Sequence, residues 1–221
     1  MTKAFKIITA LLLSLLMLTA AAPVSFALDD NEISDWAKEE VEKAKDFGLI
    51  PDELLCDYRK GITREEFAVV MVRLFNKGDP HFPATDFEEP KDIAEIKNAE
   101  YTDAVRTALK YELMTLDENG NFNPGKVMTR DEGVRCLGNL FTVCRRHAFK
   151  LGESGMLLDY RVEDYHESAQ GGAWKVLYFI RVLKGVSEKR LAPQSIFTRE
   201  QCFVSALRFK RVIDGENYGD G

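Results

Sequence analysis

A short signature occurs three times along this chain of 221 residues, and it constrains the fold more than any other feature. Each copy reads apolar residue, Thr, Arg, acidic residue and then Glu or Gln, and the three threonines lie 66 and 69 residues apart. The copies are Ile62-Thr63-Arg64-Glu65-Glu66, Met128-Thr129-Arg130-Asp131-Glu132 and Phe197-Thr198-Arg199-Glu200-Gln201. A repeat at this period predicts supersecondary units that bury one shared core.

Apolar residues recur at helical spacing on both sides of each signature. The upstream sets are Ala37, Val41, Ala44 and Gly48, then Tyr101, Val105 and Ala108, then Trp174, Leu177 and Tyr178. The downstream sets are Phe67, Val70, Met71 and Leu74, then Cys136, Leu137 and Leu140, then Cys202, Ala206 and Phe209. The sequence therefore predicts an all-α fold of three helix–loop–helix units.

The signature itself predicts the start of each downstream helix. A threonine at the N-cap with Glu or Gln three residues later forms a capping box, which stabilises a helix start by about 1 kcal/mol. The predicted capping pairs are Thr63 with Glu66, Thr129 with Glu132, and Thr198 with Gln201.

Capping does not explain why an arginine stands at the first helical position of each copy: Arg64, Arg130 and Arg199. The helix dipole disfavours a cation there by about 0.3–1 kcal/mol. In one interpretation the acidic residue that follows each arginine offsets this cost. In the other, the guanidinium and the free helix amides together bind a carboxylate or phosphate. Three occurrences at one structural position favour the anion site, and the first interpretation stays open.

Residues 1–27 predict a secretory signal peptide. Lys3 and Lys6 precede an apolar run from Ile7 to Leu18, and small residues lead to a cleavage site after Ala27. A retained anchor helix is the alternative, but about 20 apolar residues are needed to span a membrane and this run is shorter. We therefore expect an exported protein.

Composition excludes several classes. A net charge of -6 and a pI near 5.3 argue against nucleic acid as a partner, and a mean hydropathy of -0.23 argues against a multi-span membrane protein. The four cysteines show no paired spacing, so we expect free thiols in the core. With three histidines, a zinc site is not expected.

Neither catalysis nor a cofactor is expected from the motifs. The chain contains no GxSxG, HExxH or phosphate-loop pattern. The run from Asp117 to Asn121 resembles a calcium loop, but Phe122 and Met128 stand where such a loop needs glycine and a bidentate acid. We interpret it as a glycine-containing turn.

The repeats resemble the S-layer homology (SLH) domain. SDWAKEEVEKAKDFGLI followed by ITREEFAVVMVRLF is similar to a whole repeat. NGNFNPGKVMTRDEGVRCLGNLF and KGVSEKRLAPQSIFTREQCFVSALRF are similar to the second half of the motif. The resemblance implies SLH repeats at 28–76, 86–144 and 159–212.

What the resemblance implies goes beyond the residues themselves. Such triplets form a pseudo-threefold, all-helical spindle around a shared core and anchor exported proteins to secondary cell wall polysaccharide of Gram-positive-type walls, often through a pyruvylated amino sugar. The binding grooves lie between adjacent repeats. Carried over by position, the expected glycan-binding residues are Arg64, Arg130, Arg199, Trp36, Asp35 and Gly48. The expected location is the cell wall or surface layer.

The later repeats depart from this pattern. Glu100 and Ala169 occupy the position of Trp36, while Glu112 and Arg181 occupy that of Gly48. We therefore expect the first repeat to have the best site. Tyr58 stands where the other two copies have proline, so we expect a different loop there. A protein–protein module of a surface layer, without glycan binding, remains the alternative function.

Overall fold

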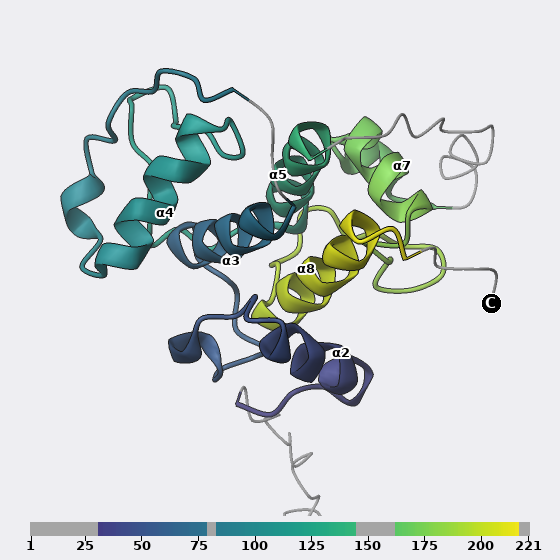
Figure 1. The fold of residues 1–221 in the computed structure, drawn as a ribbon. Helices are drawn as coiled ribbons and strands as arrows, with labels where there is room; N and C mark the ends of the chain where they lie inside the picture. The colour runs from purple at the N-terminus through teal and green to yellow at the C-terminus, as the bar shows by residue number, and fades with distance from the viewer. Residues whose placement is uncertain (1–30, 79–82, 145–161, 217–221) are drawn as a thin grey trace, which may run out of the picture.

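The computed structural model describes residues 31–78, 83–144 and 162–216 (Figure 1), so the predicted signal peptide at 1–27 lies outside the described residues. These ranges contain six α-helices and no strand, which confirms the all-α prediction. The helices are α2 Asp35–Asp46, α3 Arg64–Lys77, α4 Ala99–Lys110, α5 Arg130–Val143, α7 Gly171–Phe179 and α8 Arg199–Ile213. Three short 3-10 helices lie at Asp52–Leu54, Ile93–Glu95 and Tyr165–Glu167. No described helix has the length and apolarity needed to cross a membrane.

The helices form three consecutive pairs, here called unit 1 (α2 and α3), unit 2 (α4 and α5) and unit 3 (α7 and α8). The first helix of each unit packs mainly on the second helix of another unit: α2 lies on α8, α4 on α3, and α7 on α5 (Figure 1). Helix α3 also contacts both α5 and α8. Each unit therefore buries its apolar faces against its neighbours, as expected when one repeat is too small to form a core alone.

The buried side chains follow the helical periodicity of the sequence. All predicted downstream positions are buried, from Phe67 in α3 to Phe209 in α8, and so are the upstream positions except Gly48 and Tyr178. Tyr178 is 36% exposed, so its assignment to the core was wrong.

The four cysteines are free thiols. Cys136 and Cys202 are buried in the core, and burial raises the pKa of the Cys136 thiol to about 11. Cys56 and Cys144 are only partly buried. The expectation of core thiols therefore holds for two of the four.

The segments that precede the three long helices are joined by equivalent backbone hydrogen bonds. The amide of Ile62 donates to the carbonyl of Phe197 at 2.9 Å, Met128 donates to Ile62 at 3.0 Å, and Phe197 donates to Met128 at 2.9 Å. These three bonds link unit 1 to unit 3, unit 2 to unit 1 and unit 3 to unit 2. The starts of α3, α5 and α8 are thereby fixed next to one another.

The first helix of each unit ends in the same backbone conformation despite the different residues. Gly48, Glu112 and Arg181 have φ values of 69°, 54° and 58°. Glycine adopts this left-handed region without strain, and the other two residues do so at a cost. The replacement of glycine therefore left the course of the backbone unchanged.

The loop of unit 1 differs from the other two, as predicted from Tyr58: it contains the 3-10 helix Asp52–Leu54, and Asp57 follows Gly48 by 9 residues, whereas Asn123 and Ala192 follow Glu112 and Arg181 by 11. Only the end of the loop keeps the shared backbone. Asp57, Asn123 and Ala192 all have positive φ, at 47°, 57° and 51°. The carbonyl of Tyr58 accepts from the amide of Glu200 just as the carbonyl of Pro124 accepts from Glu65. Proline is compatible with this conformation but is not needed for it.

Candidate functional site

A capping box fixes the start of each long helix. The amide of Thr129 donates to the Glu132 carboxylate at 2.8 Å, and the amide of Glu132 donates to the Thr129 hydroxyl at 3.2 Å. The same reciprocal pair joins Thr63 with Glu66, and Thr198 with Gln201. Each box places an arginine at the first helical position, pointing away from its own helix into a neighbouring unit.

The three arginines are buried, with exposed fractions of 6% for Arg64, 4% for Arg130 and 6% for Arg199. Each donates to the loop that leads into the next long helix. Arg64 donates from Nε to the carbonyl of Phe122 at 2.6 Å and from Nη2 to that of Thr115 at 2.8 Å. We call this contact, with the loop 112–123 and the start of α5, the Arg64 interface.

The Arg130 interface repeats this arrangement between units 2 and 3. Arg130 donates from Nε to the carbonyl of Leu191 and from Nη2 to that of Lys184, both at 2.8 Å. Its third nitrogen, Nη1, donates to the amide oxygen of Gln201 at 3.1 Å. The interface comprises the loop 181–192 and the start of α8. Burial lowers the pKa of Arg130 to about 10, with the charge of Asp164 acting in the opposite direction.

The Arg199 interface closes the cycle between units 3 and 1, at the loop 48–57 and the start of α3. Arg199 donates from Nη1 to the carbonyl of Cys56 at 3.0 Å. Its Nη2 lies 2.6 Å from the Glu66 carboxylate, which occupies the position of Gln201 in the Arg130 interface. Burial alone would lower the pKa of Arg199, but the hydrogen bond and charge of Glu66 outweigh it and raise the pKa.

In two of the three copies, the acidic residue after the arginine has a role that the sequence did not predict. The Glu200 carboxylate accepts from the backbone amide and the hydroxyl of Ser34, both at 2.9 Å, at the start of α2. Asp131 accepts from the hydroxyl of Ser168 and from Nε1 of Trp174 at 2.9 Å, at α7. These carboxylates therefore fasten the first helix of another unit instead of merely offsetting the neighbouring arginine.

Side chains from an earlier segment hold each loop, and sequence reasoning missed them. Asp92 accepts from the amides of Phe122 and Asn123 at 2.8 and 2.6 Å, and Asp164 accepts from those of Leu191 and Ala192 at 2.8 Å. In unit 1 the Asn31 side chain accepts from the amide of Asp57 at 3.2 Å. The available signal was an aspartate six residues before the N-cap in units 2 and 3, at Asn98 and Gln170.

A pocket of about 330 Å³ opens at the Arg130 interface. Its lining comes from all three units: Trp36 of α2, Arg130 of α5, the loop residues 183–186, and α8 residues that include Glu200, Gln201 and Arg208. Trp36 and Val186 are each 53% exposed, so the pocket is open to solvent beside an indole ring. This combination of an exposed aromatic ring with buried and exposed cations is suited to a sugar that carries an anionic group.

The structure brings together only two of the six residues predicted to bind glycan, namely Trp36 and Arg130. Arg64 and Arg199 lie at the other two interfaces. Asp35 is the exposed first residue of α2, and Gly48 is exposed just beyond the end of that helix. The predicted first-repeat site is therefore distributed over units: Trp36 lies with the arginine of unit 2 and not with Arg64. Lys184 and Arg208, which sequence reasoning did not select, also line the pocket.

Trp174, the other tryptophan, is fully buried and lies beneath the Arg130 guanidinium, whose carbon is 5.5 Å from the ring centroid. It supports the arginine from the core side and does not line the pocket.

The calcium-like run is a turn, as expected. Asp117 accepts from the amides of Asn119 and Asn121 at 2.9 Å, and Gly120 has a φ of 80°. The hydrogen bond from the Asn121 amide, supported by Asn123, lowers the pKa of Asp117. In the described ranges, no group of three or more His, Cys, Asp or Glu side chains is arranged to hold a metal ion.

The family model of the S-layer homology domain matches residues 91–132. The matched segment runs through Asp92, α4 and the following loop to the capping box that contains Arg130, within unit 2. No curated protein matches the chain. S-layer homology domains are non-catalytic and anchor proteins at the cell surface, typically to cell wall polysaccharide. The match supports this family and indicates an association with the cell surface.

Proposed function

We propose that this protein is a non-catalytic anchoring module that is secreted and binds secondary cell wall polysaccharide through its signature arginines. The observation that carries the proposal is the pocket at the Arg130 interface, where an exposed tryptophan lies beside a buried guanidinium. The family match to the segment that contains Arg130 supports the same class of ligand.

The proposal includes three tandem SLH repeats arranged about a pseudo-threefold axis. The cycle of hydrogen bonds through Ile62, Met128 and Phe197 supports it, because each bond repeats the same contact between successive units. Gly61, Val127 and Ile196 occupy equivalent positions, and a Cβ at Gly61 would lie 2.5 Å from Val127 and 2.6 Å from Ile196. Three equivalent residues thus converge on one point.

In the proposed complex, the sugar ring stacks on Trp36 and the carboxylate of a pyruvyl ketal meets Arg130 and Lys184. A planar guanidinium suits a carboxylate, and the nearby ammonium adds attraction without needing a fixed geometry. With a chain charge of -6, long-range attraction to an acidic polymer is absent, so binding depends on these placed cations. Asp35 and Gly48, near the two ends of α2, are proposed to contact further sugar units.

Co-sedimentation of the purified protein with wall sacculi tests the proposal. Native walls would be compared with walls whose ketal pyruvate has been removed by mild acid, and wild type with Arg64→Ala, Arg130→Ala, Arg199→Ala and Trp36→Ala. We expect binding to native walls that is lost when pyruvate is removed and is weakened by Trp36→Ala without loss of helicity. Absence of binding to either wall would overturn the proposal.

Assembly with other surface-layer proteins is the second candidate function. It is favoured by the Glu66 carboxylate that already pairs with Arg199, and by Glu100 at the position equivalent to Trp36. Retention on walls that have been stripped of polysaccharide but still carry their surface proteins would support it.

A further inference from the structure

We propose that only one of the three equivalent interfaces binds the acidic glycan, namely the Arg130 interface, and that Gln201 and Lys184 determine this selectivity. The inference rests on the proposed function and identifies which of its sites is active. It follows from comparing the residues that stand at equivalent positions around the three arginines.

The Arg130 interface has an excess of positive charge. Arg130 and Lys184 line the pocket, and in the described part of the chain neither has a carboxylate oxygen within 4.0 Å. Arg208 is already paired with Glu40 at 2.5 Å, and the one carboxylate in the lining, Glu200, accepts two hydrogen bonds from Ser34. The guanidinium donates to the neutral amide oxygen of Gln201 at 3.1 Å.

The Arg64 interface has additional carboxylates and lacks the exposed lysine. Arg64 also has no described carboxylate within 4.0 Å, but Glu132 replaces Gln201 and Asp117 replaces Val186, and both charges act on the guanidinium. Thr115 replaces Lys184, so the exposed cation is missing. Lys126 pairs with Glu132 at 2.6 Å, and Asp117 remains to oppose the charges of Arg64 and Arg135. None of the residues 168–173, which lead into α7 and form its start, is aromatic, so the surface that Trp36 provides at α2 is missing here.

The Arg199 interface is acidic and already occupied by the protein itself. Glu66 pairs directly with Arg199 at 2.6 Å, in the way a ligand carboxylate would. Glu100 replaces Trp36. It pairs at 2.7 Å with Arg73, which is the residue equivalent to Arg208. The buried phenol of Tyr101 lies near Glu53, Glu66 and Arg199, and burial followed by the Glu53 charge raises its pKa.

The same scaffold therefore gives three different electrostatic environments. An anionic sugar gains by replacing the weak Gln201 contact of Arg130. At Arg199 it would have to displace Glu66 from a largely buried ion pair, which leaves a carboxylate without its partner. The ligand class that fits is a sugar with a carboxylate, held at one position per chain.

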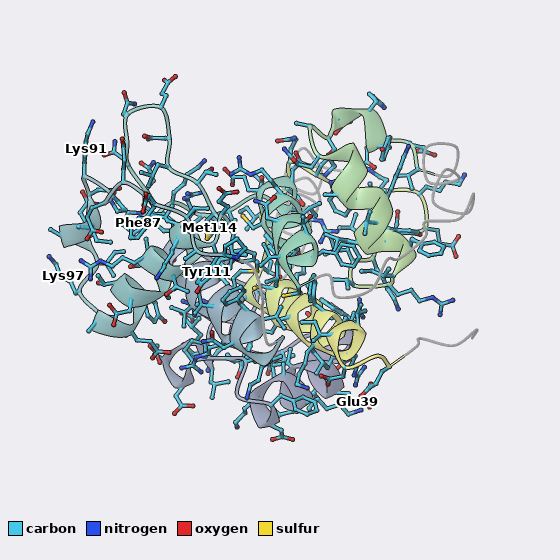
Figure 2. All side chains as sticks on the ribbon, turned by 45° about the horizontal axis from the view of Figure 1, so that its top comes forward. Glu39, Phe87, Lys91, Lys97, Tyr111 and Met114 are labelled. Carbon is cyan, nitrogen blue, oxygen red and sulfur yellow. The ribbon has the colours of Figure 1, made fainter. Side chains whose placement is uncertain are left out.

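Titration calorimetry of the full chain with a monovalent probe tests the inference. The probe is the methyl glycoside of a 4,6-pyruvylated N-acetylhexosamine, and its pyruvate-free form is the control ligand. The variants Gln201→Glu and Lys184→Thr copy residues that the chain already carries at equivalent positions. Gln194→Glu and Lys97→Thr make the same chemical changes at exposed positions outside the pocket. Figure 2 shows Lys97 beside α4, at the edge of the molecule.

We expect one probe per chain, weakening of about tenfold or more in Gln201→Glu and in Lys184→Thr, and affinities within about twofold of wild type in both controls. Two or three sites per chain, or unchanged binding in both pocket variants, would overturn the inference while leaving the proposed function standing. If the wild type binds neither the probe nor native walls, the proposed function fails and this inference fails with it. Circular dichroism of each variant verifies the fold, and Lys184→Thr changes only an exposed side chain.

Discussion

The Arg130 and Arg199 interfaces share a motif, a capping box and the backbone at the start of the long helix, yet they differ in the hydrogen-bond partners of the guanidinium. Arg130 has three hydrogen bonds to neutral oxygen atoms, whereas Arg199 combines a carbonyl with the carboxylate of Glu66. The first interface opens into a pocket beside Trp36. In the second, the position of Trp36 is taken by Glu100, which is paired with Arg73.

The difference shows that the third residue of the capping box, Glu66 or Gln201, decides whether the neighbouring arginine is held in an ion pair or stays available to a ligand. Glu and Gln serve equally well as the third residue of a capping box, so the helix start tolerates either. The same side chain also faces the arginine of the preceding unit, where its charge matters. Four predictions test this comparison, from the largest expected effect to the smallest.

Removing the arginine should destabilise the Arg199 interface more than the Arg130 interface. Arg199→Met leaves the Glu66 carboxylate, whose side chain is 14% exposed, without a cationic partner, and we expect a loss of about 3 kcal/mol. Arg130→Met leaves only neutral acceptors, and we expect about 2 kcal/mol. Urea unfolding followed by circular dichroism measures both. Equal losses would show that the ion pair adds nothing beyond the carbonyl contacts.

Exchanging Gln201 and Glu66 should give each arginine the kind of partner that the other arginine has in the wild type. Gln201→Glu creates a buried ion pair with Arg130 and should raise the free energy of unfolding by about 1 kcal/mol, while Glu66→Gln should lower it by about 1–2 kcal/mol. Both variants keep their capping boxes. Thermal melts of the two variants and of the double variant measure the exchange, and a destabilised Gln201→Glu would contradict the comparison.

The loops of the two interfaces should respond differently to acid. Burial alone would raise the pKa of Asp164, but the amides of Leu191 and Ala192 outweigh it and lower the pKa. The ionised Asp164 carboxylate therefore contributes its full stabilisation above the unfolded-state pKa of about 3.9. This stabilisation is lost as the pH falls through the lower pKa of the folded state.

Asp164→Asn should lower the free energy of unfolding by about 1–2 kcal/mol at pH 7. Below a pH of about 4, the free energy of unfolding should fall less steeply in this variant than in wild type. The Arg199 loop is held by the neutral Asn31, so Asn31→Ala should shift stability by the same amount at both pH values. Urea unfolding of wild type and both variants at pH 7 and pH 3 gives the stability change of each variant at each pH. A decline in Asp164→Asn as steep as in wild type would count against this assignment.

The helix ends should show the smallest effects, with opposite signs. Arg181, at the start of the Arg130 loop, has a φ of 58°, so Arg181→Gly should stabilise the protein by up to about 1 kcal/mol. Gly48 has a φ of 69° at the start of the Arg199 loop, and Gly48→Ala should destabilise it by about 1 kcal/mol. Thermal melts are sufficient. A stabilising Gly48→Ala would mean that the unfolded-state entropy dominates.

Much of the local structure was predictable because it depends on neighbours in the sequence. Helical periodicity located the buried faces, and the Thr-x-x-Glu or Gln spacing located the helix starts, since both depend on residues within one turn. Prediction was incomplete where conformation is set from a distance. Tyr58 indicated a different loop, and the loop of unit 1 does contain the 3-10 helix Asp52–Leu54, but the Glu200 amide of unit 3 holds the carbonyl of Tyr58 in the conformation that the other two loops share.

The sequence predicted which kinds of residue form the candidate site, but not which of these residues lie together. The repeated motif pointed to the arginines, and the resemblance pointed to Trp36. That Trp36 shares a pocket with Arg130 depends on α2 packing on α8. No local pattern specifies which unit a helix packs against, because equivalent units offer similar apolar faces.

The sequence by itself determined the three units, their helices and the arginine at each helix start, because these follow from periodicity, capping and the conformational preferences of single residues. Only the tertiary structure decided that each arginine binds carbonyls of the next unit, that Glu200 and Asp131 fasten the helices of other units, and that Gln201 faces Arg130. Those contacts join residues more than 30 positions apart, and burial gives them their strength, so they exist only after the chain has folded.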